Sequence, residues 1–162
     1  MKQEELNKFR DLIDEMDTKL IEILIKRASY VKEVGRRKKQ SNLAEFRPER
    51  EVEIIERMCK LNKKLNGNLP STSVATIWLE IISGCRSLEK RLKIAYLGPS
   101  GTYSELAART LFGHQVVFVP FDSLEEVMDA GEKKECDISL LPVENSIEGT
   151  VGRTLDLFLT TS

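Results

Sequence analysis

The sequence is poor in the residues that build metal centres, disulfide frameworks and membrane spans. Its 162 residues include three cysteines and one histidine, an odd number of thiols at spacings that match no metal-ligand motif. The N-terminal residues lack the apolar core of a secretion signal, and no apolar run is long enough to cross a bilayer. These absences predict a reduced, metal-free, cytoplasmic protein that is neither secreted nor inserted in a membrane.

Charge is divided unevenly between two parts of the sequence. The net charge is −1, yet residues 93–162 hold 5 Lys and Arg against 11 Asp and Glu, which leaves 20 against 15 for residues 1–92. In the basic part, acidic residues are mixed in throughout, and no cationic run carries the interleaved aromatic residues of a nucleic-acid surface. We therefore expect two different domains and no nucleic-acid partner.

Residues 2–39 form one predicted helix with a charge in its apolar seam. Pro is absent from this stretch and the first Gly is Gly35, so the helix should be about 50 Å long. Spacings that alternate between three and four residues form a heptad seam through Leu6, Phe9, Ile13, Met16, Leu20, Ile23, Arg27, Tyr30 and Val34. A domain of this size cannot bury such a seam alone, so the expected partner is a second copy of the helix.

Four cations lie on or beside this seam: Arg10, Arg27, Lys38 and Arg50. Arg27 and Lys38 are about three turns apart and share a face, whereas Arg10 lies about 25 Å from Arg27 along the helix. In an antiparallel twofold dimer, Arg10 of one protomer would approach Arg27 and Lys38 of the other, giving two composite sites. The spacing equally allows Arg27 to be only a polar residue that sets helix register.

The rest of the chain predicts two more helices and then an alternation of strands and helices. The helices are expected at 48–65, where Pro48 precedes acidic residues, and at 71–88. From residue 93, strands are expected at 93–97, 115–119 and 137–141, and helices at 103–112, 122–134 and 151–159. This order predicts a parallel sheet with right-handed crossovers. We expect one domain over 1–91 and an incomplete second domain over 93–162.

The turn Gly98–Thr102 lies between the first expected strand and the helix that follows it. Backbone amides at such a turn can hold an anion. The turn matches neither a P-loop nor a dinucleotide-binding spacing, so it does not by itself indicate a cofactor.

Two sets of residues carry a resemblance to known families. The first consists of Arg10, Arg27, Val34-Gly35 with Lys38, Arg50-Glu51 and the run 81–89, and through it residues 1–90 resemble the all-helical class of chorismate mutases. The second consists of the runs 98–104 (Gly-Pro-Ser-Gly-Thr-Tyr-Ser) and 141–146 (Leu-Pro-Val-Glu-Asn-Ser), and through it the rest resembles the start of a prephenate dehydratase domain. Together they resemble the bifunctional chorismate mutase-prephenate dehydratases of phenylalanine biosynthesis. This implies an all-α three-helix domain, intertwined as a dimer, followed by an incomplete α/β parallel-sheet domain.

The resemblance implies a reaction that needs no nucleophile, metal or cofactor. Conversion of chorismate to prephenate is an intramolecular rearrangement, so the protein must hold a dicarboxylate in its reactive conformer and stabilise charge on the ether oxygen. The implied catalytic residues are Lys38 and Glu89, which donate to that oxygen. The implied substrate-binding residues are Arg10 and Arg27 for the carboxylates, Arg50 in support, Glu51 for the substrate hydroxyl, and Cys85.

Three positions depart from the family's pattern. Arg47 stands where an Asp is common, which would leave the hydroxyl contact to Glu51 alone. Glu89 stands where a neutral Gln is common, and a carboxyl must be protonated to donate a hydrogen bond; alternatively, Glu89 points to solvent in a surface salt bridge. Cys85 stands where a Ser is common, and it is equally well explained as a core residue of the third helix.

In the second domain, the resemblance places Glu144, Asn145 and Ser146 in a substrate cleft, although a polar turn after a buried strand explains them equally well. The Thr-Arg-Phe motif of the family's dehydratase centre does not occur in the 162 residues, so dehydratase activity is not expected.

The leading hypothesis is therefore a homodimeric chorismate mutase that converts chorismate to prephenate and carries a truncated dehydratase segment. The alternative is a non-catalytic helical dimerisation module that tethers a small-molecule-binding α/β domain. That alternative does not require Lys38, Arg50, Glu51 and Glu89, all of which are present at family spacing.

Overall fold

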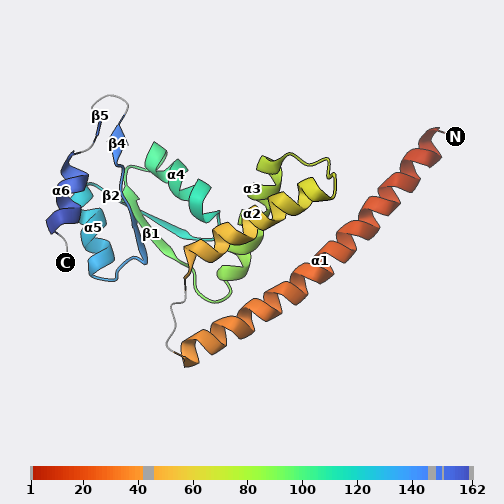
Figure 1. Cartoon of the computed structure of the whole chain (residues 1–162), viewed down its shortest axis with the longest axis horizontal. Coiled ribbons are helices and arrows are strands. Elements are labelled where there is room, and N and C mark those ends of the chain that lie inside the picture. Colours follow the sequence, from red (N-terminus) through yellow and green to blue (C-terminus); the bar gives the residue numbers. More distant parts are fainter. Residues whose placement is uncertain (1, 42–45, 146–148, 151, 161–162) are drawn as a thin grey trace.

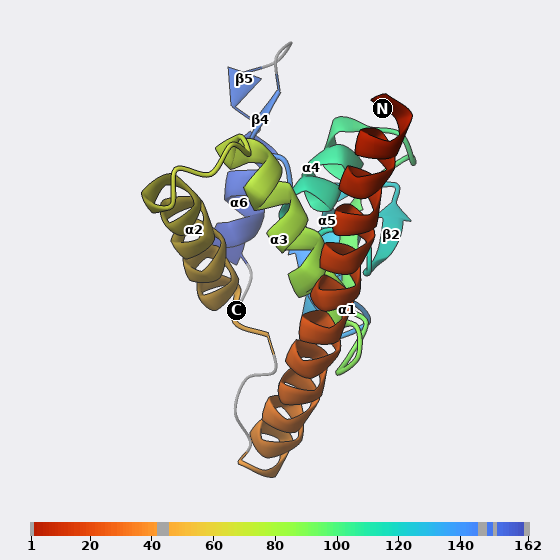
Figure 2. The same cartoon turned by 90° about the vertical axis from the view of Figure 1, so that its right-hand side faces the viewer.

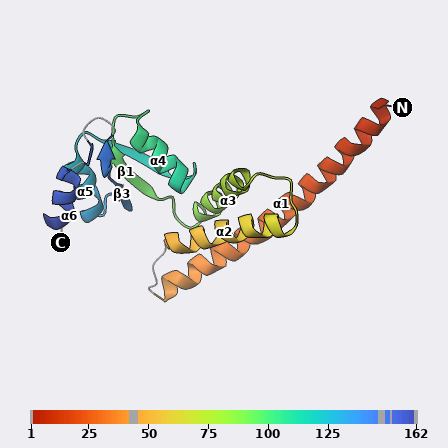
Figure 3. The same cartoon turned by 45° about the horizontal axis from the view of Figure 1, so that its top comes forward.

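The computed structural model describes residues 2–41, 46–145, 149–150 and 152–160. Its first part consists of the helices α1 (Lys2–Gln40), α2 (Pro48–Lys64) and α3 (Ser71–Arg86), which confirms the three expected helices. Helix α3 lies between α1 and α2 and contacts both (Figure 2). The N-terminal part of α1 extends beyond the other two helices, and the two chain termini lie at opposite ends of the molecule (Figures 1 and 3).

Local charge interactions contribute to the stability of helix α1. Acidic side chains occupy its first turn and basic side chains its last, as the helix dipole favours. Lys19 pairs with Glu15 one turn away at 2.6 Å, and hydrogen bonds from Arg36 and Arg37 lower the pKa of Glu33 to about 2. Eleven large apolar side chains of α1 are nevertheless at least 46% exposed: Leu6, Phe9, Leu12, Ile13, Met16, Leu20, Ile21, Ile23, Ile25, Tyr30 and Val34.

The second part is built on a three-stranded parallel sheet. Strand β1 (Lys93–Leu97) lies in the centre, between β2 (Val117–Phe121) and β3 (Ile138–Leu140). Because successive side chains of a strand face opposite sides, Ile94 packs on the face covered by α4 (Tyr103–Phe112), in a cluster that includes Ala108. Ala95 packs on the opposite face against Val127 and Ala130 of α5 (Leu124–Glu132). The parallel sheet and its crossover helices agree with the expected fold class.

The second strand was expected at 115–119, and the structure corrects it to β2, Val117–Phe121. Lys93 pairs with Val117, so β2 begins two residues later than the sequence pattern indicated. The backbone N–H of Gln115 instead donates to Ser83 Oγ of α3 at 3.1 Å. The first residues of the expected strand are thus used to dock the second part of the chain on the first.

Two short strands near the C-terminus were not expected. Strand β4 (Glu144–Asn145) pairs antiparallel with β5 (Gly149–Thr150), and α6 (Gly152–Thr160) follows. Thr154 of α6 is fully buried, and its hydroxyl donates to the Pro142 carbonyl at 2.8 Å. These residues had been expected as a turn and a helix, because strands of two residues leave no periodicity to detect.

A charged contact ties the connection between the two parts to the sheet. Asp137 accepts hydrogen bonds from Lys90 Nζ and, at 2.9 Å, from the backbone N–H of Lys93. Burial opposes ionisation of Asp137, but these hydrogen bonds outweigh it and lower its pKa. Among the residues that the structure describes, no helix has both the length and the apolar composition needed to cross a membrane.

Candidate active site

A cavity of 440 Å³ opens between the three helices, within the size range of small-molecule sites. Helix α1 contributes the residues of one face, α2 its first two turns, and α3 its C-terminal end. The lining residues are Arg27, Tyr30, Val31, Val34, Lys38, Phe46, Arg47, Arg50, Glu51, Ile54, Ile82, Cys85, Arg86 and Glu89. Six of the seven site residues expected in the helical part therefore lie around one cavity: Arg27, Lys38, Arg50, Glu51, Cys85 and Glu89.

Helical spacing explains how residues distant in sequence converge here. Arg27 and Lys38 are separated by about three turns of α1, so both side chains face the same side. Pro48 starts α2, which places Arg50 and Glu51 in its first turn. Cys85 lies in the last turn of α3, and Glu89 lies in the turn that follows this helix. Five cations and two carboxylates line the cavity, a formal excess of three positive charges that suits an anionic ligand.

Arg27 is the most distinctive group in this cavity. Its side chain is half-buried in the seam of α1, and its Nη1 atom is buried without a hydrogen-bond acceptor among the described residues. A buried donor without an acceptor costs about 1–3 kcal/mol, more when the group is charged. An acceptor brought by a ligand would remove that cost.

The two carboxylates of the cavity are held differently. Both carboxylate oxygens of Glu51 accept hydrogen bonds from Nη1 of Arg86, at 2.7 and 2.6 Å. The side chain of Glu51 is 17% exposed and that of Arg86 is 11% exposed. Glu89 is half-buried, and its carboxylate lies against α1: a Cβ added at Gly35 would be 2.5 Å from Glu89 Oε2. Gly35 is thus required for Glu89 to lie where it does beside the cavity.

The remaining lining residues differ in exposure and in partners. Arg50 Nη1 donates to Glu53 at 3.0 Å, and Arg47 Nε donates to Glu49 at 3.1 Å, at the exposed start of α2. A hydrogen bond from the backbone N–H of Glu49, and secondly the one from Arg47, lower the pKa of the Glu49 carboxyl. Cys85 is buried at the cavity wall, so its position suits both the core and the ligand-contact interpretations.

The other expected site residues lie outside this cavity. Arg10 is exposed on the projecting part of α1, about 25 Å along the helix from Arg27. Glu144 is exposed in β4 and Asn145 ends that strand, whereas Ser146 lies outside the described residues. Across the described ranges, no three His, Cys, Asp or Glu side chains gather as a metal site would require.

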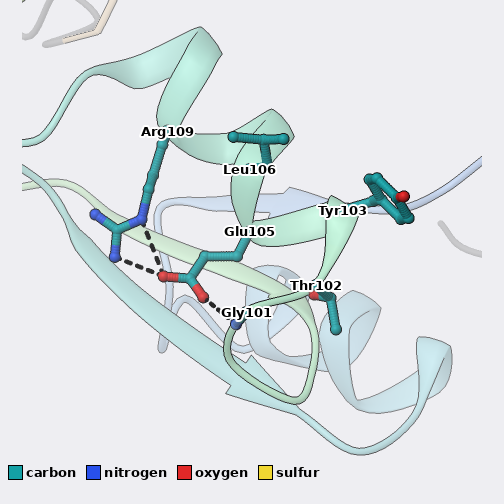
Figure 4. A pocket seen from close by; sticks show the side chains of 6 residues that line it. All are labelled: Gly101, Thr102, Tyr103, Glu105, Leu106 and Arg109. Atoms are coloured by element: carbon teal, nitrogen blue, oxygen red, sulfur yellow. Dashed lines mark hydrogen bonds and ion pairs between the residues drawn. The ribbon is translucent and has the colours of Figure 1, made fainter.

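A second hollow, of 750 Å³, lies at the start of α4 and is shown in Figure 4. The backbone N–H of Gly101 donates to Glu105 Oε2 at 2.6 Å, and Arg109 donates to Oε1 of the same carboxylate. The Gly101 amide and then Arg109 lower the pKa of Glu105. The turn that could have held an external anion through its amides is therefore engaged by a carboxylate of its own chain.

Arg86 and Phe46 also line this cavity, and neither was identified from the sequence as a site residue. The Arg86 guanidinium lies 5.4 Å from the centroid of the Phe46 ring, and its Nε is buried without an acceptor among the described residues. Arg86 belongs to the motif run 81–89, but helical spacing alone does not show that it reaches Glu51. That contact joins α2 and α3 and becomes visible only when the helices are packed.

The fold and the cavity define a helical domain with a predominantly cationic cavity between its helices, joined to part of an α/β domain. Comparison with protein families gives the same division. The family model "Chorismate mutase type II" matches residues 9–90, and the model "Prephenate dehydratase" matches residues 94–162. The chain belongs to the chorismate mutase type II family and continues into a prephenate dehydratase segment.

Several relatives share both parts. The "Bifunctional chorismate mutase/prephenate dehydratase" of Aquifex aeolicus is 42% identical over 157 residues, which cover 96% of this chain and 43% of the relative. The protein of the same description from Pseudomonas aeruginosa is 40% identical over 163 residues, covering 97% and 44%. A prephenate dehydratase structure from Streptococcus mutans aligns with 44% of this chain and 37% of its own, at 39% identity and a TM-score of 0.38. The chain thus spans less than half the length of these relatives.

Proposed function

We propose that the helical domain catalyses the rearrangement of chorismate to prephenate in phenylalanine biosynthesis. The observation that carries this proposal is the buried Nη1 of Arg27, which has no acceptor among the described residues and lies in a cavity with an excess of positive charge. A carboxylate of the substrate would accept from this atom and offset the excess charge. The non-catalytic alternative gives no role to the other charged groups around the same cavity.

Within this proposal, each lining group has a task that its position allows. Arg27 and Arg10 of the partner subunit bind the carboxylates of chorismate, with Arg50 in support, and hold the compact conformer in which the reacting carbons meet. Lys38 and a protonated Glu89 donate to the ether oxygen, which gains negative charge as its bond to carbon breaks. Glu51 accepts the substrate hydroxyl. Donors held in position before the reaction would stabilise the transition state without reorganising.

We further propose that two chains pair through α1 and share their sites. Eleven apolar side chains of this helix are at least 46% exposed, a larger uncovered apolar surface than soluble single domains normally present. An antiparallel twofold pair would cover those that lie on the heptad seam and bring Arg10 of the partner subunit to the cavity that contains Arg27.

The direct test of the mutase assignment is a chorismate consumption assay with identification of the product. The wild-type chain should form prephenate, and Arg27→Ala should not. A dimeric chain that leaves chorismate unchanged would instead favour the dimerisation module.

The shared site has a separate test. A mixture of Arg10→Ala and Arg27→Ala chains should regain activity, because some heterodimers would contain one intact site. Verified heterodimers without activity would contradict the shared site.

We propose that the dehydratase segment, residues 93–162, forms a domain of its own that docks on residues 1–91 and does not dehydrate prephenate in this chain. The catalytic Thr-Arg-Phe motif expected from the family is not among the 162 residues, and binding alone cannot replace catalytic groups. Phenylpyruvate formed from prephenate at neutral pH, above the rate without protein, would contradict this.

A further inference from the structure

Arg86 joins the cavity of the helical domain to the dehydratase segment. It is the last residue of α3, and its side chain is 11% exposed. Nη1 donates to both oxygens of Glu51 in α2, whereas Nη2 donates to the carbonyl oxygen of Phe112, the last residue of α4, at 2.6 Å. One rigid guanidinium fork therefore connects a residue of the proposed mutase site with the second part of the chain.

The same carbonyl is held in place by a wider contact between the two parts. Residues 112–115 lie along one face of α3, on side chains spaced three residues apart: Glu80, Ser83 and Arg86. The backbone N–H of Gln115 donates to Ser83 Oγ at 3.1 Å, and the ring Nδ1 of His114 lies 2.7 Å from Glu80 Oε1.

Gly113 makes this close approach possible. Its φ of +73° is one that other residues rarely adopt, and a Cβ there would lie 2.7 Å from the Cβ of Ser83. The position of the Phe112 carbonyl relative to α3 is thus set by a packed junction and not by a mobile loop end.

Aromatic packing extends this junction into the wall of the cavity. The rings of Phe46 and Phe112 lie 6.2 Å apart between centroids, and Phe46 also faces the Arg86 guanidinium. Phe46 itself lines the cavity. The wall beside Glu51 is therefore built partly from a residue that packs on the dehydratase segment.

This arrangement matters for Glu51 because of the cations around it. A carboxylate has about four lone-pair positions, and Nη1 of Arg86 occupies one on each oxygen, so the others stay available to a ligand hydroxyl. Without Arg86, the Glu51 carboxylate would be drawn to Arg27 or Arg50 in the same cavity. It would then compete with the carboxylates of the substrate for those cations.

We propose that Arg86 is a positioning residue for the mutase reaction, and that the dehydratase segment orients the Arg86 guanidinium toward Glu51 through the Phe112 carbonyl. This inference rests on the proposed mutase function. It assigns the junction a specific effect: docking of the second part of the chain on α3 strengthens substrate binding in the helical domain.

The test uses full-length chains and separates KM from kcat. In Arg86→Met, loss of the fork should raise KM for chorismate by about tenfold or more, the equivalent of one charge-assisted hydrogen bond, and change kcat by less than about threefold. In a Glu51→Gln background the same substitution should leave KM within about twofold, because the competing carboxylate charge is gone. A purely structural role would give equal losses in both backgrounds.

A matched control and a second route to the same contact complete the design. Arg109 resembles Arg86 in pairing with a glutamate and lying over a phenylalanine, 4.4 Å from the Phe118 centroid, but it does not line the cavity. Arg109→Met should leave KM unchanged. His114→Ala removes a contact of the junction from an exposed side chain, so the chain should still fold, and it should raise KM in the same direction as Arg86→Met by about two- to threefold.

The outcomes distinguish the two proposals. An active wild-type chain whose KM is unchanged in both Arg86→Met and His114→Ala overturns the inference and leaves the mutase function standing. Equal KM increases for Arg86→Met with and without Glu51→Gln also overturn it. A wild-type chain that folds and does not convert chorismate overturns the mutase function, and the inference with it.

Discussion

Replacing Arg27 by methionine should strongly lower activity and stabilise the protein. The substitution removes a half-buried cation whose buried Nη1 has no acceptor among the described residues, while keeping an unbranched apolar side chain in the seam of α1. Relief of the unpaired donor is worth about 1–3 kcal/mol, and apolar replacement of buried charged groups is often stabilising. We expect the free energy of unfolding to rise by about 1 kcal/mol, part of the gain being offset by lost packing.

Activity should change in the opposite sense. A guanidinium that binds a carboxylate through two charge-assisted hydrogen bonds, each worth about 1.5–3 kcal/mol, contributes about 3–6 kcal/mol to binding. Since 1.4 kcal/mol corresponds to a factor of ten, kcat/KM for Arg27→Met should fall by about 10²- to 10⁴-fold. The opposite signs follow from one cause, because the atom that is costly in the empty cavity is the atom that binds the ligand.

The measurements are thermal unfolding followed by circular dichroism and initial rates of chorismate consumption, on wild type and variant at equal protein concentration. Arg57→Met is the control, because Arg57 is an exposed cation of α2 that does not line the cavity, and it should change neither quantity appreciably. A less stable Arg27→Met protein would refute the reasoning, since Arg27 would then be a structural residue that sets helix register. Retained activity would refute it equally.

Four further predictions follow from other contacts. Gly35→Ala should lower kcat at least tenfold in steady-state assays, because the new Cβ displaces the Glu89 carboxylate; unchanged kcat would show that Glu89 need not lie there. Glu89→Gln should keep activity and flatten the alkaline side of the pH–rate profile from pH 5 to 9, because an amide donates a hydrogen bond at any pH in this range. Superimposable profiles of wild type and variant would count against Glu89 as the donor to the ether oxygen. Asp137→Asn should lower the free energy of unfolding by about 1 kcal/mol at pH 7. Because the folded-state pKa of Asp137 is lowered, the stability difference between wild type and variant should persist above about pH 4 and vanish as the pH falls further. A difference in urea midpoints that does not depend on pH would contradict this. Limited proteolysis should leave a core that ends near Arg91, because the sheet of the second part has exposed edge strands, and equal protection of both parts would argue against this.

The elements that could be predicted from sequence were those in which local pattern and tertiary contact agree. The three helices and β1 carry a clear period and clear end signals, such as Pro48 before α2, so their bounds differ from the expected ones by at most two residues. Strand β2 was misplaced by two residues because the backbone N–H of Gln115 donates to Ser83 of α3, a contact that the local sequence pattern does not record. The β4–β5 pair was missed because its strands are too short to show a period.

The candidate site shows the same division. Arg27, Lys38, Glu51 and Glu89 were singled out by residue type, spacing and family resemblance, and the structure gathers them around one cavity. Arg86 was not singled out, because its role depends on two partners 35 and 26 positions away in the chain. No short-range pattern records such contacts.

The sequence by itself determined the helix and strand types, the parallel order of the sheet and the chemical character of the site, because hydrophobic period and charge are properties of neighbouring residues. Tertiary structure alone decided that Arg27 Nη1 is buried without an acceptor, that Glu51 is held by Arg86, and that residues 112–115 rest on α3. Those features depend on how helices pack against one another and against the sheet. They arise from shape and burial, which only the folded chain defines.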